Sequence, residues 1–228
     1  MNDLSETRSP SSSVGDYLKA IWELAADSGD AASTKGVAVR LSVSSASVSN
    51  MFARLQEMGL VRYERYRGAT LTGRGREEAL RLVRRHRLIE TFLLEHLGYD
   101  WQEVHEEAER LEHAVSDGFT ERLAALLGHP DHDPHGDPIP SAEGTLEVED
   151  TFTLSHAVAG QRVLISKVKD EDAATLDYFG DRNLVPGRRL RVREVRVLDG
   201  VVTVEDEDAK VYALGEPLAR SVFVRNDL

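Results

Sequence analysis

The chain of 228 residues contains no cysteine. Disulfides and thiolate metal sites are therefore excluded, which leaves histidine and carboxylates as the strong side-chain metal ligands. No stretch approaches the roughly 20 apolar residues that a membrane helix needs. The polar opening, MNDLSETRSPSSS, has no apolar core of the kind that a secretory signal carries. These absences predict a cytoplasmic protein without a membrane partner.

Motifs of the common enzyme classes are also missing. The sequence has no phosphate-binding glycine loop, no G-x-S-x-G elbow and no cysteine nucleophile. The zinc-protease pattern H-E-x-x-H fails because Glu109 stands four positions after His105, where the second histidine belongs. We therefore predict that the chain is not an enzyme.

Acidic residues outnumber basic residues in the whole chain, but one segment is strongly basic. The net charge is −12, yet residues 33–87 hold twelve Lys or Arg against four acidic residues, a local net charge of +8. The rest of the chain therefore carries −20. A basic block on an acidic chain indicates a module that binds phosphate groups, attached to parts that do not.

The basic block has the pattern of a winged helix-turn-helix. Apolar spacing predicts three helices followed by a β-hairpin, with Thr34 as the cap of the second helix. The helices cover residues 14–26, 34–41 and 45–58, and the strands cover 61–66 and 69–71. A tight turn between the second and third helices, followed by a hairpin, is typical of DNA-binding modules.

Three more helices and a β-rich segment are predicted after the hairpin. Thr72, Asp100 and Ser116 are placed to cap helices that end near residues 97, 115 and 127. The proline-rich segment 129–140 cannot continue a helix. Beyond it the apolar period changes to two, which predicts a small β-barrel. Its expected strands are 163–168, 189–197, 200–206, 210–214 and 221–225, with one helix near 172–179.

The third predicted helix opens with small and hydroxylated side chains. Ser44, Ala46 and Ser47 would let a helix lie deep in the major groove, and Asn50 is able to pair with two atoms of an adenine edge. Basic side chains suited to phosphates lie around them: Lys35, Arg54, Arg65 and Arg67. The alternative is a serine-rich, solvent-facing helix in a protein–protein module.

Potential metal ligands gather on three of the predicted helices. At about 100° per residue, four of them share one third of a single helix: His105, Glu109, Glu112 and His113. The preceding helix carries His86 and Glu90 on one face, and the first helix carries Asp16 on its inward side. Oxygen and imidazole ligands without sulfur favour Mn(II) or Fe(II), with Zn(II) a third candidate. The alternative is a solvated acidic helix with incidental histidines.

The chain resembles the diphtheria toxin repressor/manganese transport regulator family over nearly its whole length. The carrying motifs are DYLKAIWEL, SSASVSNMFARLQEMGLV, YERYRGATLTGRG, VRRHRLIETFL, HEEAERLEH and PHGDPIP. The resemblance implies a homodimeric, metal-activated repressor that binds double-stranded palindromic operator DNA. It also implies an α+β fold of three domains: an N-terminal winged helix-turn-helix (1–73), a helical dimerisation and metal-binding domain (74–140), and a C-terminal SH3-like (FeoA-like) β-barrel (150–228).

The resemblance also assigns site residues by position. A primary metal site falls on Asp16, Glu109, Glu112 and His113, and a second set falls on His86, Glu90 and His105, with His86 also a ligand in the manganese branch. The barrel would add a ligand near Asp172, and base contacts fall on Ser44, Ala46 and Asn50.

Two positions decide between the metal branches of the family. Iron-sensing members place Met and Cys where this chain has Asp16 and Glu109, so the resemblance favours Mn(II), with Fe(II) the second candidate. Lys19 stands where manganese regulators usually carry a glutamate, and a cation there disfavours a second closely spaced metal ion. A metal-independent winged-helix regulator, whose barrel binds a small ligand or peptide, stays as the alternative function.

Overall fold

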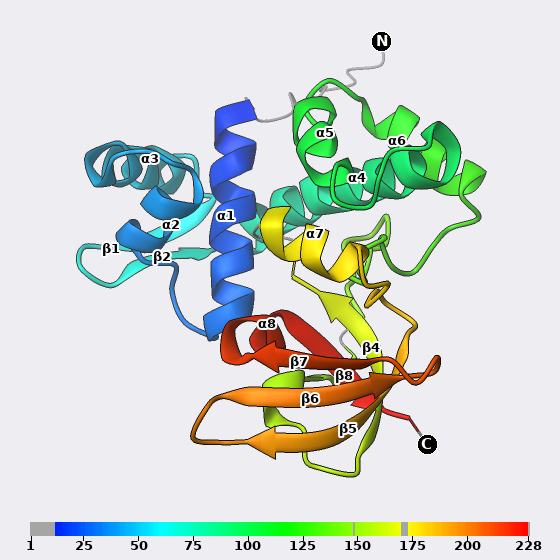
Figure 1. Cartoon of the computed structure of the whole chain (residues 1–228). Helices are drawn as coiled ribbons and strands as arrows, with labels where there is room; N and C mark the ends of the chain where they lie inside the picture. Colours follow the sequence, from blue (N-terminus) through cyan, green and yellow to red (C-terminus); the bar gives the residue numbers. More distant parts are fainter. Residues whose placement is uncertain (1–11, 148, 170–172, 228) are drawn as a thin grey trace. The chain divides into compact units, whose positions relative to one another are not determined.

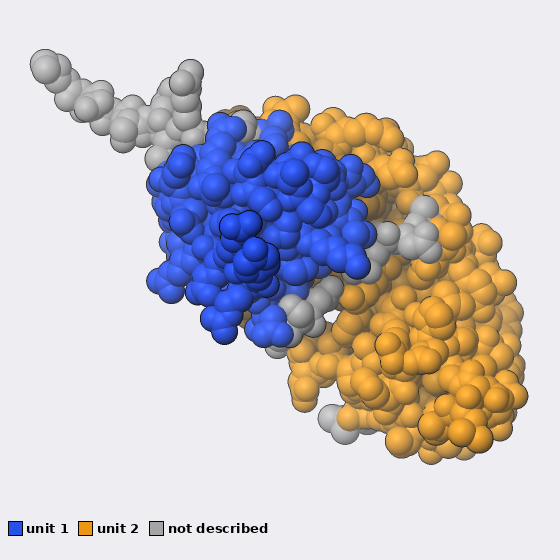
Figure 2. All heavy atoms as spheres, turned by 90° about the vertical axis from the view of Figure 1, so that its left-hand side faces the viewer, with its two compact units in different colours: residues 1–85, 140–144 blue, residues 86–139, 145–228 orange. Residues whose placement is uncertain are grey.

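The computed structural model describes residues 12–147, 149–169 and 173–227, in a fold that mixes helices and sheets (Figure 1). The chain forms two compact units, which Figure 2 distinguishes by colour. The first contains the chain up to residue 85 together with residues 140–144, and the second contains residues 86–139 and the chain from residue 145 onward. No helix in the described ranges is both long enough and apolar enough to span a lipid bilayer.

The first unit has the predicted winged helix-turn-helix. It contains α1 (Ser12–Ser28), α2 (Thr34–Arg40), α3 (Ser45–Glu57), β1 (Val61–Glu64), β2 (Gly68–Leu71) and the start of α4 (Gly73–Leu97). The antiparallel β1 and β2 form the wing. Ile21, Phe52 and Leu55 are fully buried in this unit. Burying such side chains stabilises a domain by about 1.5–3 kcal/mol each.

The predicted cap of α2 was wrong by one residue. Ser33, not Thr34, accepts a hydrogen bond from the backbone N–H of Gly36, at 3.0 Å. Ser33 has the extended backbone that an N-cap requires, whereas Thr34 is already helical. Ser44 caps α3 in the same way by accepting from the N–H of Ser47 at 3.1 Å.

The helical part of the second unit differs from the prediction at α5. This part contains the rest of α4, α5 (Val104–Leu111) and α6 (Asp117–Leu126). Asp100 does not cap α5: its carbonyl accepts from the N–H of Glu103 in a turn, and the helix begins without a side-chain cap. The helix also ends four residues before Val115, because the N–H of Ala114 closes a tight turn onto Leu111. Ser116 caps α6 as predicted.

The C-terminal part of the second unit is one antiparallel sheet of order β3-β8-β4-β5-β6-β7. Its elements are β3 (Phe152–Thr153), η1 (Leu154–His156), β4 (Arg162–Val168), α7 (Ala173–Gly180), β5 (Arg189–Arg196), β6 (Val201–Asp206), β7 (Val211–Gly215), α8 (Glu216–Ser221) and β8 (Val222–Asn226). The five predicted strands are β4 to β8, and α7 is the predicted helix. In the described part of the chain β3 and β7 stay edge strands, so the expected barrel is not closed.

Strand β4 carries a bulge in its pairing with β8. Ile165 pairs with Val224 and Lys167 pairs with Phe223, which leaves Ser166 as an extra residue between them. The buried positions accordingly shift from Val163 and Ile165 to Val168. A bulge of this kind re-aims the side chains that follow it.

Asp206 at the end of β6 accepts four hydrogen bonds. It is buried, and it accepts from the guanidinium of Arg188 and the hydroxyl of Tyr212, both at 3.0 Å. The backbone N–H groups of Asp208 and Lys210 donate to it at 2.9 Å. Burial by itself raises the pKa of Asp206, but Arg188 and these hydrogen bonds outweigh burial and lower the pKa.

We expect Asp206→Asn to lower the free energy of unfolding by about 1–3 kcal/mol at pH 7, because the buried amide offers one oxygen fewer to the donors of Arg188, Tyr212, Asp208 and Lys210. Arg188 itself keeps Asp208 and Glu207 as partners. A carboxylate with a lowered pKa stabilises the fold above its ordinary value of 3.8 and loses that contribution as the pH falls through the folded-state value. Urea unfolding from pH 7 to pH 3 therefore tests whether the variant and the parent converge in acid. Asp199→Asn, at an exposed ion pair with Arg196, is the matched control and should change little.

Candidate functional site

Helix α3 presents the predicted base-reading residues to solvent. Ser44, Ala46, Ser47 and Asn50 are all exposed, as is Arg54 further along the helix. The opposite face anchors the helix, because its apolar side chains are buried. The structure therefore places the five predicted contacts of this helix on one accessible surface, which suits insertion into a DNA groove.

The wing carries two of the predicted phosphate contacts of the first unit. Arg65 and Arg67 lie in the exposed turn between β1 and β2, and Arg67 pairs with Glu64 at 3.1 Å. Between them Tyr66 is 92% exposed, with the Arg65 guanidinium 5.1 Å from its ring centroid. The Gln56 side chain accepts from the N–H of Tyr63 at 2.8 Å, which couples the wing to α3. Lys35 is exposed on α2.

The predicted metal ligands are divided between the two units. Asp16 is half-buried on α1 of the first unit, and Lys19 on the same helix is buried there. The second unit contains His86 and Glu90 on α4, His105 and Glu109 on α5, and Glu112 and His113 directly after α5. Asp172 lies outside the described residues.

Three of these side chains could share one metal ion in the second unit. His86, His105 and Glu109 each offer one ligand atom, and the three atoms lie within 4.8 Å of one another. His86 Nε2 is 3.2 Å from His105 Nδ1, and His105 Nε2 is 4.0 Å from Glu109 Oε1. His86 also places its Nδ1 2.5 Å from Glu112 Oε2, so its imidazole lies between α4 and the end of α5.

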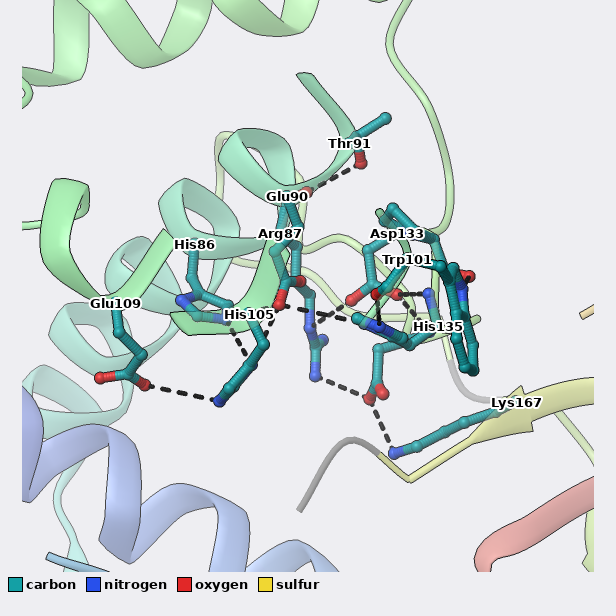
Figure 3. A network of polar contacts seen from close by, with 12 residues as sticks. His86, Arg87, Glu90, Thr91, Trp101, His105, Glu109, Asp133, His135 and Lys167 are labelled. Carbon is teal, nitrogen blue, oxygen red and sulfur yellow. Dashed lines mark hydrogen bonds and ion pairs between the residues drawn. The ribbon is translucent and has the colours of Figure 1, made fainter. Parts of the chain in front are cut away.

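Glu90 is the carboxylate around which the imidazoles gather (Figure 3). It is fully buried, and its Oε1 lies 2.9 Å from His86 Nε2 and 3.0 Å from His105 Nδ1. Burial by itself raises the pKa of Glu90, but His86, His105 and His135 outweigh burial and hold the pKa below its ordinary value. Glu90 is therefore an anion at neutral pH.

Two further residues of this cluster were missed in the sequence. His135 and Asp133 come from the proline-rich segment, and with Glu90 they form a second group of ligand atoms within 4.8 Å. All three are buried. His135 Nε2 lies 2.9 Å from the carbonyl of Trp101 and must donate to it, so Nδ1 faces Glu90 at 3.9 Å. The available signal was a His and an Asp two residues apart beside a glycine, in a segment that looked like a linker.

A charged network joins this cluster to β4 of the sheet (Figure 3). The Arg87 guanidinium lies 3.4 Å from Asp133 and 2.8 Å from Asp137. Lys167 on β4 then contacts Asp137 at 2.7 Å. The backbone supports the same connection, because the N–H of Val168 donates to the carbonyl of His135 at 2.9 Å.

The donor set around Glu90 fits a divalent cation. Among the described residues Glu90 Oε2 and His135 Nδ1 are buried without a hydrogen-bond partner, which is costly unless another group satisfies them. Burial raises the pKa of Asp133 well above its ordinary range, and the carboxylates of Asp137 and Glu90 raise it further. Imidazole and carboxylate donors crowded in this way suit Mn(II), Fe(II) or Zn(II).

Comparison with known families covers both units. The model of the iron dependent repressor N-terminal DNA-binding domain matches residues 11–69, and that of the iron dependent repressor metal-binding and dimerisation domain matches residues 72–141. The model of the FeoA domain matches residues 152–226.

Individual relatives agree with these matches. The iron-dependent repressor IdeR of Mycobacterium bovis is 36% identical over 220 residues, which cover 91% of this chain and 94% of that protein. A solved manganese-dependent transcriptional repressor in complex with manganese is 42% identical, with a TM-score of 0.89 over 94% of this chain and all of that chain. The manganese regulator SloR has a TM-score of 0.78 at 36% identity, over 94% of this chain and 98% of that chain. The chain therefore belongs to the iron-dependent repressor (diphtheria toxin repressor) family of metal-dependent, DNA-binding transcriptional repressors.

Proposed function

We propose that this repressor is activated by Mn(II), with Fe(II) the second candidate, and that it controls metal-ion homeostasis from a palindromic operator. The observation that carries the proposal is the buried group of carboxylates and imidazoles around Glu90, which contains no sulfur ligand. Hard oxygen donors with imidazoles favour Mn(II) among the family's metals. The printed name of one similar structure, a manganese-dependent repressor in complex with manganese, supports the same choice.

The proposed ligands are those predicted from the sequence, together with Asp133 and His135. Glu109, Glu112 and His113 would form one site with Asp16, which enters this proposal from the sequence resemblance alone. Further ligands would come from the cluster around Glu90: His86, Glu90, His105, Asp133 and His135. Whether Asp172 adds a ligand stays a prediction.

A homodimer is the proposed binding form. Leu97 at the end of α4 is 56% exposed, and Phe119 and Leu126 on α6 are 47% and 63% exposed. Large apolar side chains on a helical dimerisation domain support an interface with a second copy. Such a dimer binds DNA in the cytoplasm, and its two recognition helices read the halves of a palindrome when their separation matches the half-site spacing.

In the proposed mechanism, a bound metal ion limits the movement of the winged helix-turn-helix units. Asp16 belongs to the first unit and Glu109, Glu112 and His113 to the second, so ligands that share an ion hold the two units together. When bound, the cation supplies the positive charge that offsets repulsion among the carboxylates. The recognition helices of the dimer then keep the separation that the operator requires. Metal and DNA must raise each other's affinity by one common factor, typically 5- to 150-fold.

Asp16→Ala tests the mechanism. We expect the variant to lose the Mn(II)-dependent increase in operator affinity, because one ligand from the DNA-binding unit is gone, and to keep its dimer. Gel-shift titrations with and without Mn(II), beside sedimentation of the free protein, measure both properties. Asp30→Ala, an exposed acid in the same unit, is the control. Unchanged stimulation by Mn(II) in Asp16→Ala would refute the mechanism.

The rival function is a metal-independent regulator whose C-terminal domain binds a small ligand or peptide. Operator binding that does not change when a strong chelator is added would favour it. Titrations with Mn(II), Fe(II) and Zn(II), together with the metal content of the purified protein, identify the preferred ion.

A further inference from the structure

Two arginines stand directly opposite each other on the outer face of the C-terminal sheet. Arg162 on β4 and Arg191 on β5 are register partners in the antiparallel ladder, and both side chains are exposed. Like charges in directly opposed positions destabilise a sheet. An anion bound between the two guanidinium groups would offset this repulsion.

The neighbouring acidic side chains already have other partners. Arg189 pairs with Glu207 at 3.3 Å and with Asp227 at 3.4 Å. Glu205, the register partner of Arg191 on β6, lies 2.5 Å from Arg193 instead.

Arg162 and Arg191 themselves have neither a hydrogen bond nor an ion pair from their side chains to any residue in 12–147, 149–169 or 173–227. These two guanidinium groups thus keep their donors available on an otherwise paired surface. Each guanidinium has five N–H donors in a planar fork that matches the oxygens of a carboxylate or phosphate.

An open pocket lies at this place. It has a volume of about 300 Å³, and Arg162, Arg189 and Arg191 line it together with Leu190 and with acids from β6 and the C-terminal end. That volume lies at the small end of the range for small-molecule sites. The four acids of the lining, Glu205, Asp206, Glu207 and Asp227, each pair with Arg188, Arg189 or Arg193. The uncompensated charge of the lining is therefore that of Arg162 and Arg191, which suits an anion compact enough to lie between these two side chains.

We propose that this pocket binds a small oxyanion of at least two negative charges, a phosphate or a dicarboxylate, between Arg162 and Arg191. The two guanidinium groups donate paired N–H bonds to its oxygens from adjacent strands. The site shares no residue with the proposed metal ligands or with the predicted DNA contacts, so it would add a second small-molecule input to the repressor. The proposal does not depend on which metal activates the protein.

The test is a titration of the full-length protein with inorganic phosphate and with succinate at constant ionic strength. Backbone amide resonances of β4 and β5 report this site separately from the basic residues of the winged helix. We expect saturable shifts at Arg162 and Arg191 with at least one of the two anions. Arg191→Gln and Arg162→Gln should each weaken binding roughly 10-fold or more, the loss typical of charged hydrogen bonds.

A second measurement separates a binding site from a merely structural pair. Because Arg191→Gln removes the like-charge repulsion, the anion-free variant should unfold at a higher temperature than the parent. Arg191→Lys keeps the charge but loses the planar fork, so it should bind with intermediate affinity. Arg196→Gln, on the same strand but paired with Asp199, is the matched control and should bind like the parent.

Either of two results would overturn the proposal. Either the β4 and β5 resonances do not respond to millimolar phosphate or succinate, or Arg162→Gln and Arg191→Gln bind as well as Arg196→Gln. Response to succinate alone identifies a carboxylate site, response to phosphate alone identifies a phosphate site, and each supports the proposal.

Discussion

Gly136→Ala is expected to lower the free energy of unfolding of the second unit by about 4 kcal/mol or more, the range of exceptional substitutions. A Cβ at Gly136 would lie 1.9 Å from the carbonyl oxygen of Ser166 and 2.8 Å from the Cα of Lys167. Both are backbone atoms, so no side chain can turn away to make room. The φ of Gly136 is also +88°, a region that residues with a Cβ avoid.

Gly187→Ala is the matched control for this experiment. Gly187 has the same φ of +88°, but a Cβ there would meet no atom within 4 Å. We expect this control to lose only about 1–2 kcal/mol, the cost of the backbone conformation. Guanidinium unfolding of both variants beside the parent isolates the clash with β4. Equal losses would mean that the proline-rich segment moves freely away from the strand.

The second large effect is expected for Glu90→Gln, which keeps the shape of the side chain and removes its charge. Glu90 lies within hydrogen-bond distance of two imidazoles and within 4 Å of a third. If the proposed metal site is correct, the variant should bind Mn(II) about 100-fold more weakly. A ligand that binds only the folded protein stabilises it by about 2.7 kcal/mol at 100 times its Kd, and the variant should lose most of that gain.

Thermal unfolding with and without Mn(II), together with direct metal titration, measures this loss. Glu95→Gln on the same helix is the control, since Glu95 is exposed and should leave the metal-dependent shift unchanged. A parent and a Glu90→Gln variant that gain equal stability from Mn(II) would place the ion elsewhere and contradict the assignment of this cluster.

The helices and strands that were predicted well share a strong local signal. The recognition helix has three apolar residues at helical spacing, and the structure buries all three on one face of α3: Val48, Phe52 and Leu55. Its cap, Ser44, was not predicted as a cap. The predicted helix after Asp100 was wrong at both ends, because local turns at Glu103 and Ala114 compete with the helix and no side chain caps its start. The short elements β3, η1 and α8 were not predicted, because elements of so few residues are too short to show a helical or strand periodicity of apolar residues.

The site was predictable only where its residues share a helix. His86 and Glu90 are four residues apart, so helical geometry alone brings them together. His135 joins them across 45 positions of sequence because the proline-rich segment folds back, held by Asp133, which accepts from the backbone N–H groups of His135 and Asp137. This folding back of the proline-rich segment depends on its packing against Arg87 and β4. The spacing of residues in the sequence does not indicate that packing.

The bulge residue of β4, Ser166, determines whether the side chain of Lys167 can contact Asp137. Side chains along a strand alternate between two faces, so an insertion exchanges the faces of everything beyond it. Ser166 is that insertion, and Lys167, the next residue, contacts Asp137 at 2.7 Å. Removing Ser166 would return the strand to simple alternation and turn the ammonium group to the other face of the sheet. One seemingly dispensable serine thus keeps the C-terminal domain in electrostatic contact with the histidine cluster.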